Sequence, residues 1–262
     1  MFFERISEDI PEVSHKRTQL PDQSVYVNHI HRHCELLLFV TGEAEYNIDG
    51  RAFRPSPLDL LCIPAATYHY LIPSSGVPYE NYVIGIRPER LPEEQYRRIF
   101  SPPFMISIGE DSELHGFFTR LDRYRALYTP RDFCVCCEAL IGELFTYLAY
   151  RKGELESVHS RGTAYIDRIV RFIAEHLHEE LDAEIISRHF LLSRSYVQNM
   201  FSSHMHIGLK KYVQQKKIYA AHADIARGMS PREACESYAF GDYSSFYRLY
   251  RQTFDTSPRG RR

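Results

Sequence analysis

The chain has 262 residues, 44% of them apolar, and a formal net charge of -2, which are ordinary values for a globular protein. This length exceeds what one hydrophobic core usually organises, so two domains are expected. Charged residues follow directly after Met1–Phe3, and no uninterrupted apolar run approaches the roughly 18 residues of a membrane span. These features predict no signal peptide, no membrane partner and a cytoplasmic location.

Charge is unevenly distributed along the chain. Residues 159–262 hold 16 Lys and Arg against 11 Asp and Glu, whereas residues 1–158 hold 16 against 23. The basic half is therefore where nucleic acid would bind, although a surplus of this size is also ordinary for a solvated surface. The six cysteines lack zinc-ribbon spacing, so we expect free thiols that pack as small apolar groups.

Residues 25–86 alternate apolar and polar side chains in short runs separated by turn sequences, which is typical of antiparallel strands. Asp49-Gly50 between two such runs predicts a hairpin with a type I′ turn. The predicted strands span residues 35–40, 46–48, 51–53, 59–63 and 79–86. We expect residues 1–90 to form a small β-barrel or sandwich.

The same region holds His29-x-His31-x-x-x-Glu35 and, later, His69. Period-two spacing predicts His29, His31 and Glu35 on one strand face, and imidazole and carboxylate suit divalent Fe, Mn, Ni or Zn. Together with Gly42 and Pro64-x-Ala66, this spacing resembles the two cupin motifs, whose matching residues bind metal in cupin enzymes. His33 is expected to be a surface or packing residue.

An organic effector is the other interpretation of this cluster, with no metal and no cofactor. The expected effector-binding residues are His29, His31, Glu35, His69, Tyr26, Tyr46 and Tyr82, with Tyr68 beside them. The tyrosines would supply aromatic surface and hydroxyl groups, as a sugar or another small polar ligand requires.

From Leu91 the apolar period changes to three and four residues, which predicts two amphipathic helices around residues 114–125 and 140–148. Residues 91–152 would form either a dimer interface or a cover for the barrel, and the sequence does not separate the two. Gly153 and the serines that follow predict a linker over residues 153–162.

Residues 163–262 contain two helix-turn-helix patterns. Asp182 and Ser193 are predicted caps of a first pair of helices. Val197, Met200 and Phe201 should face inward on its second helix. The side chains that could then reach DNA bases are Arg194, Ser195, Gln198, Asn199 and Ser202.

A long helix, predicted over residues 209–227 and ending before Gly228, joins the two patterns. Ser230-Pro231-Arg232-Glu233 then predicts a capping box at the start of the second pair. The DNA-facing side chains expected on its last helix are Tyr243, Ser244, Tyr247, Arg248 and Arg251. Arg248 is the strongest candidate for a base contact, while Lys210, Lys211, Lys216 and Arg259–Arg262 would contact phosphates.

This tandem arrangement resembles the AraC/XylS family of bacterial transcription regulators. Leu192-Ser193-Arg194-Ser195-Tyr196 and Ser257-Pro258 occupy family motif positions, as do Phe240, Ser244, Phe246, Arg248, Tyr250 and Arg251. The resemblance implies an α+β multidomain fold with a cupin-like antiparallel barrel, a helical dimerisation segment and an all-α tandem helix-turn-helix domain. It also implies a homodimer that binds double-stranded DNA, a small-molecule effector and RNA polymerase, without catalysis.

The sequence departs from this family pattern at four positions: Ala239, Asp255, Lys217 and Ser187. A positive φ at Ala239, where the family usually has Gly, would cost roughly 1 kcal/mol. Two other functions stay open because His29, His31, Glu35 and His69 are all present. One is a metal-dependent cupin enzyme, and the other is a metal sensor whose DNA affinity follows the metal concentration.

Overall fold

The computed structural model describes residues 12–19, 28–74, 76–102, 104–109, 111–157 and 164–259. The chain divides into two compact units, Met1–Arg161 and Gly162–Arg262. The linker predicted over residues 153–162 ends at the boundary between these two units. Part of it is ordered structure, because Glu156–Ser157 forms a short strand, β9, that pairs with β8 (Met105–Ser107).

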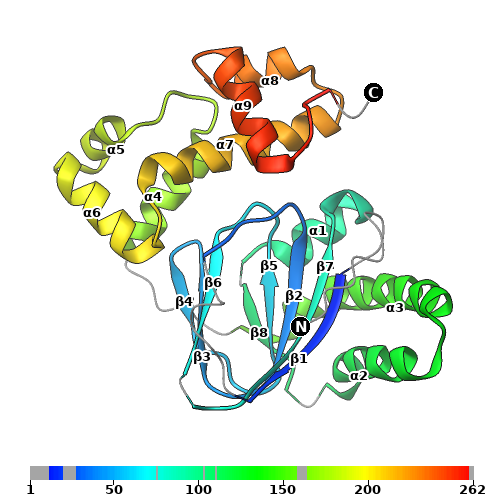
Figure 1. The fold of residues 1–262 in the computed structure, drawn as a ribbon. Coiled ribbons are helices and arrows are strands. Elements are labelled where there is room, and N and C mark those ends of the chain that lie inside the picture. Colours follow the sequence, from blue (N-terminus) through cyan, green and yellow to red (C-terminus); the bar gives the residue numbers. More distant parts are fainter. Residues whose placement is uncertain are drawn as a thin grey trace. The chain divides into compact units, whose positions relative to one another are not determined.

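Two antiparallel sheets build the first unit (Figure 1). The larger has the strand order β1-β7-β2-β5-β8-β9 and the smaller has the order β4-β3-β6. The remaining strands are β1 Glu12–Thr18, β2 Cys34–Thr41, β3 Ala44–Ile48, β4 Arg51–Phe53, β5 Asp59–Ile63, β6 His69–Pro73 and β7 Tyr79–Ile86. The five predicted strands are present, whereas β1, β6, β8 and β9 were not predicted.

The predicted type I′ hairpin joins β3 to β4. Asp49 and Gly50 have φ values of 46° and 84°, the positive values that this turn requires at both central residues. The Asn47 side chain accepts a hydrogen bond from the Gly50 N–H at 2.9 Å, which further fixes the turn.

Alternation of side chains along β2 and β5 separates two apolar layers. Leu37, Phe39 and Leu61 face the smaller sheet, where they meet Tyr46 and Ile48. Leu36, Leu38, Leu60 and Cys62 face the opposite way and meet the helices. Both faces of the larger sheet are therefore buried, and the space between the two sheets is the interior of the barrel.

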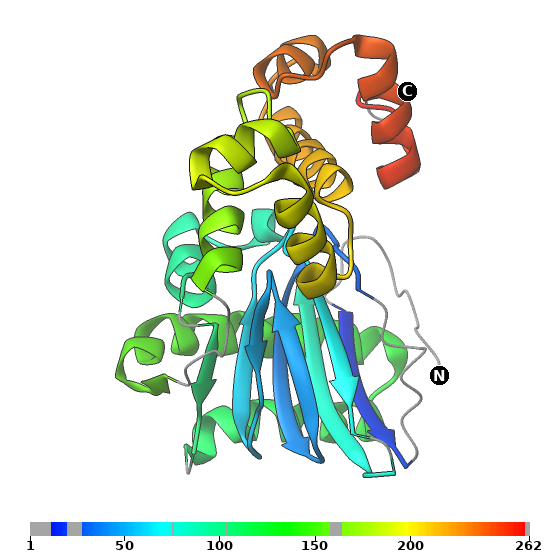
Figure 2. The ribbon, with the colours of Figure 1, turned by 90° about the vertical axis from the view of Figure 1, so that its left-hand side faces the viewer.

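Three helices cover the outer face of the larger sheet: α1 Glu93–Phe100, α2 Ser112–Leu127 and α3 Pro130–Arg151. Figure 2 shows α2 and α3 behind the strands. Phe117, Phe118 and Phe145 are fully buried in this layer. Residues 91–152 thus pack as part of the first unit, which matches the barrel-cover interpretation. The short helices η2 Pro88–Arg90 and η3 Lys152–Glu154 flank the layer.

Helix α3, extended through η3 to Glu154, is long and apolar enough to cross a membrane by length and composition alone. Charged and polar side chains interrupt this helix, so it holds no continuous apolar run. Eight side chains of α3 are buried, among them Phe133, Leu140 and Leu148, so its apolar composition serves the core of the domain.

The second unit is entirely helical in its described part. Its helices are α4 Ala164–Glu175, α5 Ala183–Phe190, α6 Arg194–Met205, α7 Leu209–Ala226, α8 Pro231–Ser237 and α9 Tyr243–Phe254. Figure 1 shows α7 running between the α5–α6 pair and the α8–α9 pair. This architecture, with the β-rich first unit, confirms the predicted fold class.

Aromatic contacts attach both pairs to α7. Phe201 of α6 packs against Tyr212 with ring centroids 5.1 Å apart. At the other end, Phe254 of α9 packs against Tyr219 at 5.1 Å and stacks on His222 at 4.2 Å. Because these side chains are large and mostly buried, α7 fixes the spacing of the two pairs.

Caps define where these helices begin. Asp182 accepts hydrogen bonds from the backbone of α5, Ser193 accepts one from α6, and Ser230 and Glu233 form the predicted capping box. Asp242, which the sequence analysis did not identify as a cap, accepts a 2.8 Å bond from the Ser245 N–H at the start of α9. Each such cap stabilises its helix by about 1 kcal/mol.

Buried thiols form part of the core of the first unit. Cys34, Cys62 and Cys137 are buried, and every described cysteine is free. Burial raises the pKa of Cys62 to about 11 and that of Cys137 to about 12, and it raises the pKa of Cys34 as well.

Ala239 has a φ of 51° in the turn before α9, so the residue that replaces the family's usual Gly adopts a left-handed conformation. We expect Ala239→Gly to stabilise the protein by up to about 1 kcal/mol, because glycine adopts this conformation without steric cost. Urea unfolding followed by far-UV circular dichroism measures the change. Ala220→Gly within α7 is the matched control and should destabilise by about 1 kcal/mol. An equal loss of unfolding free energy in both variants would contradict strain at Ala239.

Candidate functional sites

The first candidate DNA-reading surface is the outer face of α6. Five side chains predicted to read DNA are exposed there: Arg194, Ser195, Gln198, Asn199 and Ser202. Val197 and Phe201 are fully buried on the opposite face, and Met200 is half-buried. The packing of α6 therefore leaves a polar surface with one guanidinium and two amides, groups that can bond base edges.

Helix α9 carries the second candidate surface. Ser244, Arg248 and Arg251 are exposed, while Tyr243 and Tyr247 are half-buried and stand 6.3 Å apart between ring centroids. The inward face consists of buried Phe246 and Tyr250 with half-buried Leu249. The Arg248 guanidinium donates to the Ser245 hydroxyl at 3.3 Å, one turn earlier on the same face. The DNA-reading role of both surfaces stays a prediction.

The basic residues near these helices differ in exposure. Lys210, Lys211 and Arg259 are exposed, and the Lys216 ammonium lies 5.8 Å from the Tyr212 ring centroid. Arg261 and Arg262 lie outside the described residues. Lys217, which stands where the family often has Arg, is buried and donates to the Glu179 carbonyl, so it supports the packing of α7.

The histidine cluster of the first unit is brought together by two segments. His69 begins β6 and forms an isolated bridge with His29, in which each backbone N–H donates to the other residue's carbonyl at 3.1 Å. Glu35 lies on β2. The prediction that His29, His31 and Glu35 share one strand face was wrong, because a bend at Arg32 separates His29 and His31 from the strand.

Four imidazoles form one cluster. Those of His31, His33 and His69 contact Glu35, and that of His29 contacts His69. The Nε2 atoms of His31 and His33 lie 3.0 and 3.1 Å from Glu35 Oε1, and His69 Nε2 lies 3.5 Å from Oε2. His31 stacks on His33 with centroids 3.7 Å apart, and His29 meets His69 at 4.2 Å. The cluster thus includes His33, which the sequence analysis expected at the surface or in packing.

Glu35 contacts three of these rings, those of His31, His33 and His69. Burial raises the pKa of its carboxyl, but the imidazoles of His31, His33 and His69 outweigh that and hold its pKa well below the usual range. The ammonium of Lys16, on β1, is also partly buried, and this burial lowers its pKa although Glu35 opposes the shift. The cluster therefore combines a carboxylate with an excess of nitrogen donors.

Tyrosine hydroxyls lie on the interior side of the barrel. Tyr46 on β3 and Tyr79 on β7 are both buried and hydrogen-bond to each other through their hydroxyls. Tyr68 is also buried, and Tyr26 lies outside the described residues. A surface hollow of about 570 Å³ opens elsewhere, among residues that include Gly42, Arg54 and Pro73, and the histidines do not line it.

Tyr82, a predicted effector ligand, lies on the opposite face of the sheet. It pairs with Leu38 across β2 and β7, and both side chains belong to the layer that meets the helices. Its hydroxyl donates to Asp122 Oδ2 on α2 at 2.6 Å. The placement of Tyr82 among the residues of the barrel interior was therefore wrong, because strand alternation directs its ring toward α2.

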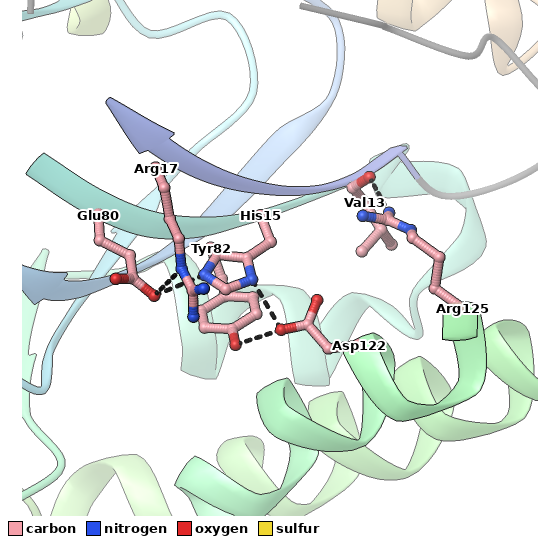
Figure 3. A network of polar contacts seen from close by, with 7 residues as sticks. All are labelled: Val13, His15, Arg17, Glu80, Tyr82, Asp122 and Arg125. Atoms are coloured by element: carbon pink, nitrogen blue, oxygen red, sulfur yellow. Dashed lines mark hydrogen bonds and ion pairs between the residues drawn. The ribbon is translucent and has the colours of Figure 1, made fainter. Parts of the chain in front are cut away.

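His15 on β1 completes this polar network, which ties the sheet to α2 (Figure 3). Its ring stacks on Tyr82 at 3.9 Å, with Nε2 2.7 Å from Glu80 Oε1 and Nδ1 2.7 Å from Asp122 Oδ2. Arg17 also binds Glu80, at 2.9 Å. Farther along β1, Arg125 of α2 donates to the Val13 carbonyl at 2.9 Å (Figure 3). Sequence reasoning missed this network because its members come from three distant segments.

Removal of the Tyr82 hydroxyl should weaken the first unit. We expect Tyr82→Phe to destabilise by about 1–2 kcal/mol, because the buried side chain would lose its hydrogen bond to the Asp122 carboxylate. Tyr150→Phe is the control, since its ring is 71% exposed, and it should change little. Urea unfolding of both variants measures the difference, and equal stabilities would contradict the role of the network.

Comparison with known proteins matches two family models to the chain, and the first extends past the boundary between the two units. Residues 11–191 match the AraC-like ligand binding domain, and residues 186–262 match a helix-turn-helix domain. The regulatory protein SoxS of Salmonella typhimurium is 24% identical over 94 residues, which are 36% of this chain and 88% of SoxS.

The Msm operon regulatory protein of Streptococcus mutans is 25% identical over 125 residues, and this chain covers 45% of its length. The crystal structure of ToxT from Vibrio cholerae matches 95% of this chain and 97% of its own, with 11% identity and a TM-score of 0.41. Since the ligand-binding family spans well over half of the residues, the chain belongs to the AraC/XylS family of regulators.

Proposed function

We propose that the protein is a bacterial transcription regulator that binds specific DNA sequences through α6 and α9. The observation that carries this proposal is the pair of helix-turn-helix modules on one rigid α7, each with an exposed polar face and at least one exposed arginine. Two such helices about one turn of DNA apart (roughly 34 Å) would enter successive major grooves. Such a protein works in the cytoplasm and needs no catalytic step.

Phosphate contacts would add affinity without sequence information. Exposed Lys210, Lys211 and Arg259 are suited to this role because lysine and arginine release counterions when they neutralise phosphates. Base contacts from Gln198, Asn199 and Arg248 would then select the sequence.

The barrel interior is the proposed effector site. His31 and His69 contact Glu35, and the hydroxyl of buried Tyr46 bonds Tyr79; these side chains would provide donors and acceptors for a small polar ligand such as a sugar. Bound effector would favour one arrangement of the DNA-binding units over another, and so promote or prevent recruitment of RNA polymerase. A ligand can do this only through different affinities for the two arrangements.

Homodimerisation would place four reading helices on tandem sites. Three apolar side chains of this helical layer are more than 60% exposed: Leu127 at the end of α2, and Val135 and Tyr150 on α3. A helical layer with such side chains is suited to contact a second copy.

Capture of fragmented host DNA by the purified protein at physiological salt tests the proposal. Discrete retained sites with paired half-sites about ten base pairs apart are the expected result. Repeating the capture with candidate effectors then tests the regulatory step, through changes in site occupancy or spacing. Diffuse, salt-sensitive retention without a shared sequence would contradict a sequence-specific regulator.

Arg248→Ala should cost about 1–3 kcal/mol of binding free energy at one base pair, because a bidentate contact between arginine and guanine would be lost. Competition binding with operators mutated one position at a time measures this. Lys210→Ala is the control. It should weaken binding to all sequences alike and reduce the number of counterions released on binding by about one, which is read from the slope of log affinity against log salt concentration. A uniform loss in Arg248→Ala would instead identify a phosphate contact.

A further inference from the structure

The turn between α4 and α5 contacts the second helix pair directly. His178 in this turn stacks its ring on Tyr238, which follows α8, with ring centroids 4.5 Å apart and planes 28° from parallel. Its Nδ1 lies 2.9 Å from the Ser237 carbonyl oxygen and donates to it, because a carbonyl only accepts hydrogen bonds. The Ser237 hydroxyl lies 3.2 Å from the same nitrogen. A side chain that precedes α5 is thus bonded to the end of α8.

Tyr238 extends this contact to α7. Its side chain is buried, and its hydroxyl donates to Asp224 Oδ2, near the end of α7, at 2.6 Å. Burial and the neighbouring Asp224 carboxylate raise the pKa of Tyr238, so the hydroxyl keeps its hydrogen and remains a donor. We call His178, Ser237, Tyr238 and Asp224 the brace.

The same turn is also attached to the middle of α7. Buried Lys217 donates to the carbonyl of Glu179, the residue that follows His178. Lys217 and Asp224 stand about two helical turns apart and so share one face of α7. The turn before α5 is therefore bonded to α7 through Lys217 and to the end of α8 through His178.

The brace restricts a motion that α7 alone permits. Phe201 and Phe254 attach the α5–α6 pair and the α8–α9 pair to α7. Long helices bend, and a pair that is attached to one helix can rock on it, so these contacts set the distance between the pairs more firmly than their relative rotation. A direct bond between the turn before α5 and the end of α8 opposes that rotation. Tyr238 also begins the turn into α9, so the brace acts where the direction of α9 is set.

We propose that the brace sets the spacing and rotation of the DNA half-sites that the protein accepts. This inference rests on the proposed function of α6 and α9 as DNA-reading helices. One base pair inserted between two half-sites moves the second by about 3.4 Å and rotates it by about 35° around the duplex. A braced protein cannot follow this displacement without losing base contacts at one helix, whereas a protein without the brace can rotate to follow it. His178 is therefore a positioning residue, which selects operators through the direction of α9.

Distances in the free full-length protein test the brace without DNA. Spin labels on an unnatural ketone residue at exposed Ser203 of α6 and Gln252 of α9 report the separation of the pairs by double electron–electron resonance. We expect a narrow distribution for the wild-type brace and one about twice as wide or more for His178→Ala, because the pairs would gain a slow collective motion.

Two further variants make this test specific. His178→Asn retains a nitrogen donor near the position of Nδ1 but has no ring, and it should give an intermediate width. Glu236→Ala is the matched control, since this side chain is 74% exposed on α8 directly before Ser237, and it should match the wild type. Circular dichroism shows that each variant folds.

Operators of altered spacing test the consequence for DNA recognition. On an operator from the DNA capture that is lengthened by one base pair between its half-sites, the wild type should lose about tenfold or more in affinity, as the loss of one bidentate base contact would cause. This loss should be smaller by about threefold or more in His178→Ala. Both proteins should bind an isolated half-site equally, which separates altered positioning from damage to either reading helix.

An unchanged distance distribution in His178→Ala overturns the proposal, and so does equal broadening in Glu236→Ala. A loss on the lengthened operator that is the same in His178→Ala as in the wild type overturns it as well. A DNA capture that finds no specific sites would contradict the proposed regulator. The distance distributions would then still decide whether the brace orients the two pairs.

Discussion

Burial of both faces of the larger sheet is the constraint on which the first unit depends. One face of β2 and β5 packs against the smaller sheet and the other packs against α1–α3. Because side chains alternate, a slip of one residue in β2 would exchange Glu35 with an apolar neighbour and would bury a carboxylate against the helices. The register therefore determines both the composition of the core and the position of the histidine cluster.

Local signals in the sequence predicted much of this fold. Asp49-Gly50 located the hairpin, and Ser193 and Ser230 located two helix starts, because turns and caps depend on a few adjacent residues. Strand β1 escaped prediction, since its place is set by pairing with β7, more than sixty residues away. Tyr82 was assigned to the wrong face because a strand buried on both sides has no polar alternation to orient it.

The site residues show the same division between local and distant information. The polar faces of α6 and α9 could be predicted because helical periodicity and caps place the apolar side chains of each helix inward. The place of His33 in the histidine cluster could not be predicted, since it depends on the bend at Arg32 and on the absence of a side chain at Gly85. His69 was identified by its motif, whereas its bridge to His29 is a tertiary contact.

The buried thiols have a consequence for oxidative signalling. Peroxides and alkylating reagents react with the thiolate, and the raised pKa values of Cys34, Cys62 and Cys137 keep these groups protonated at physiological pH. Because the same side chains fill the layer between sheet and helices, oxidation would also have to force polar oxygen atoms into that layer. These three thiols are thus shielded from oxidants, whereas Cys134 and Cys136 on α3 are only half-buried.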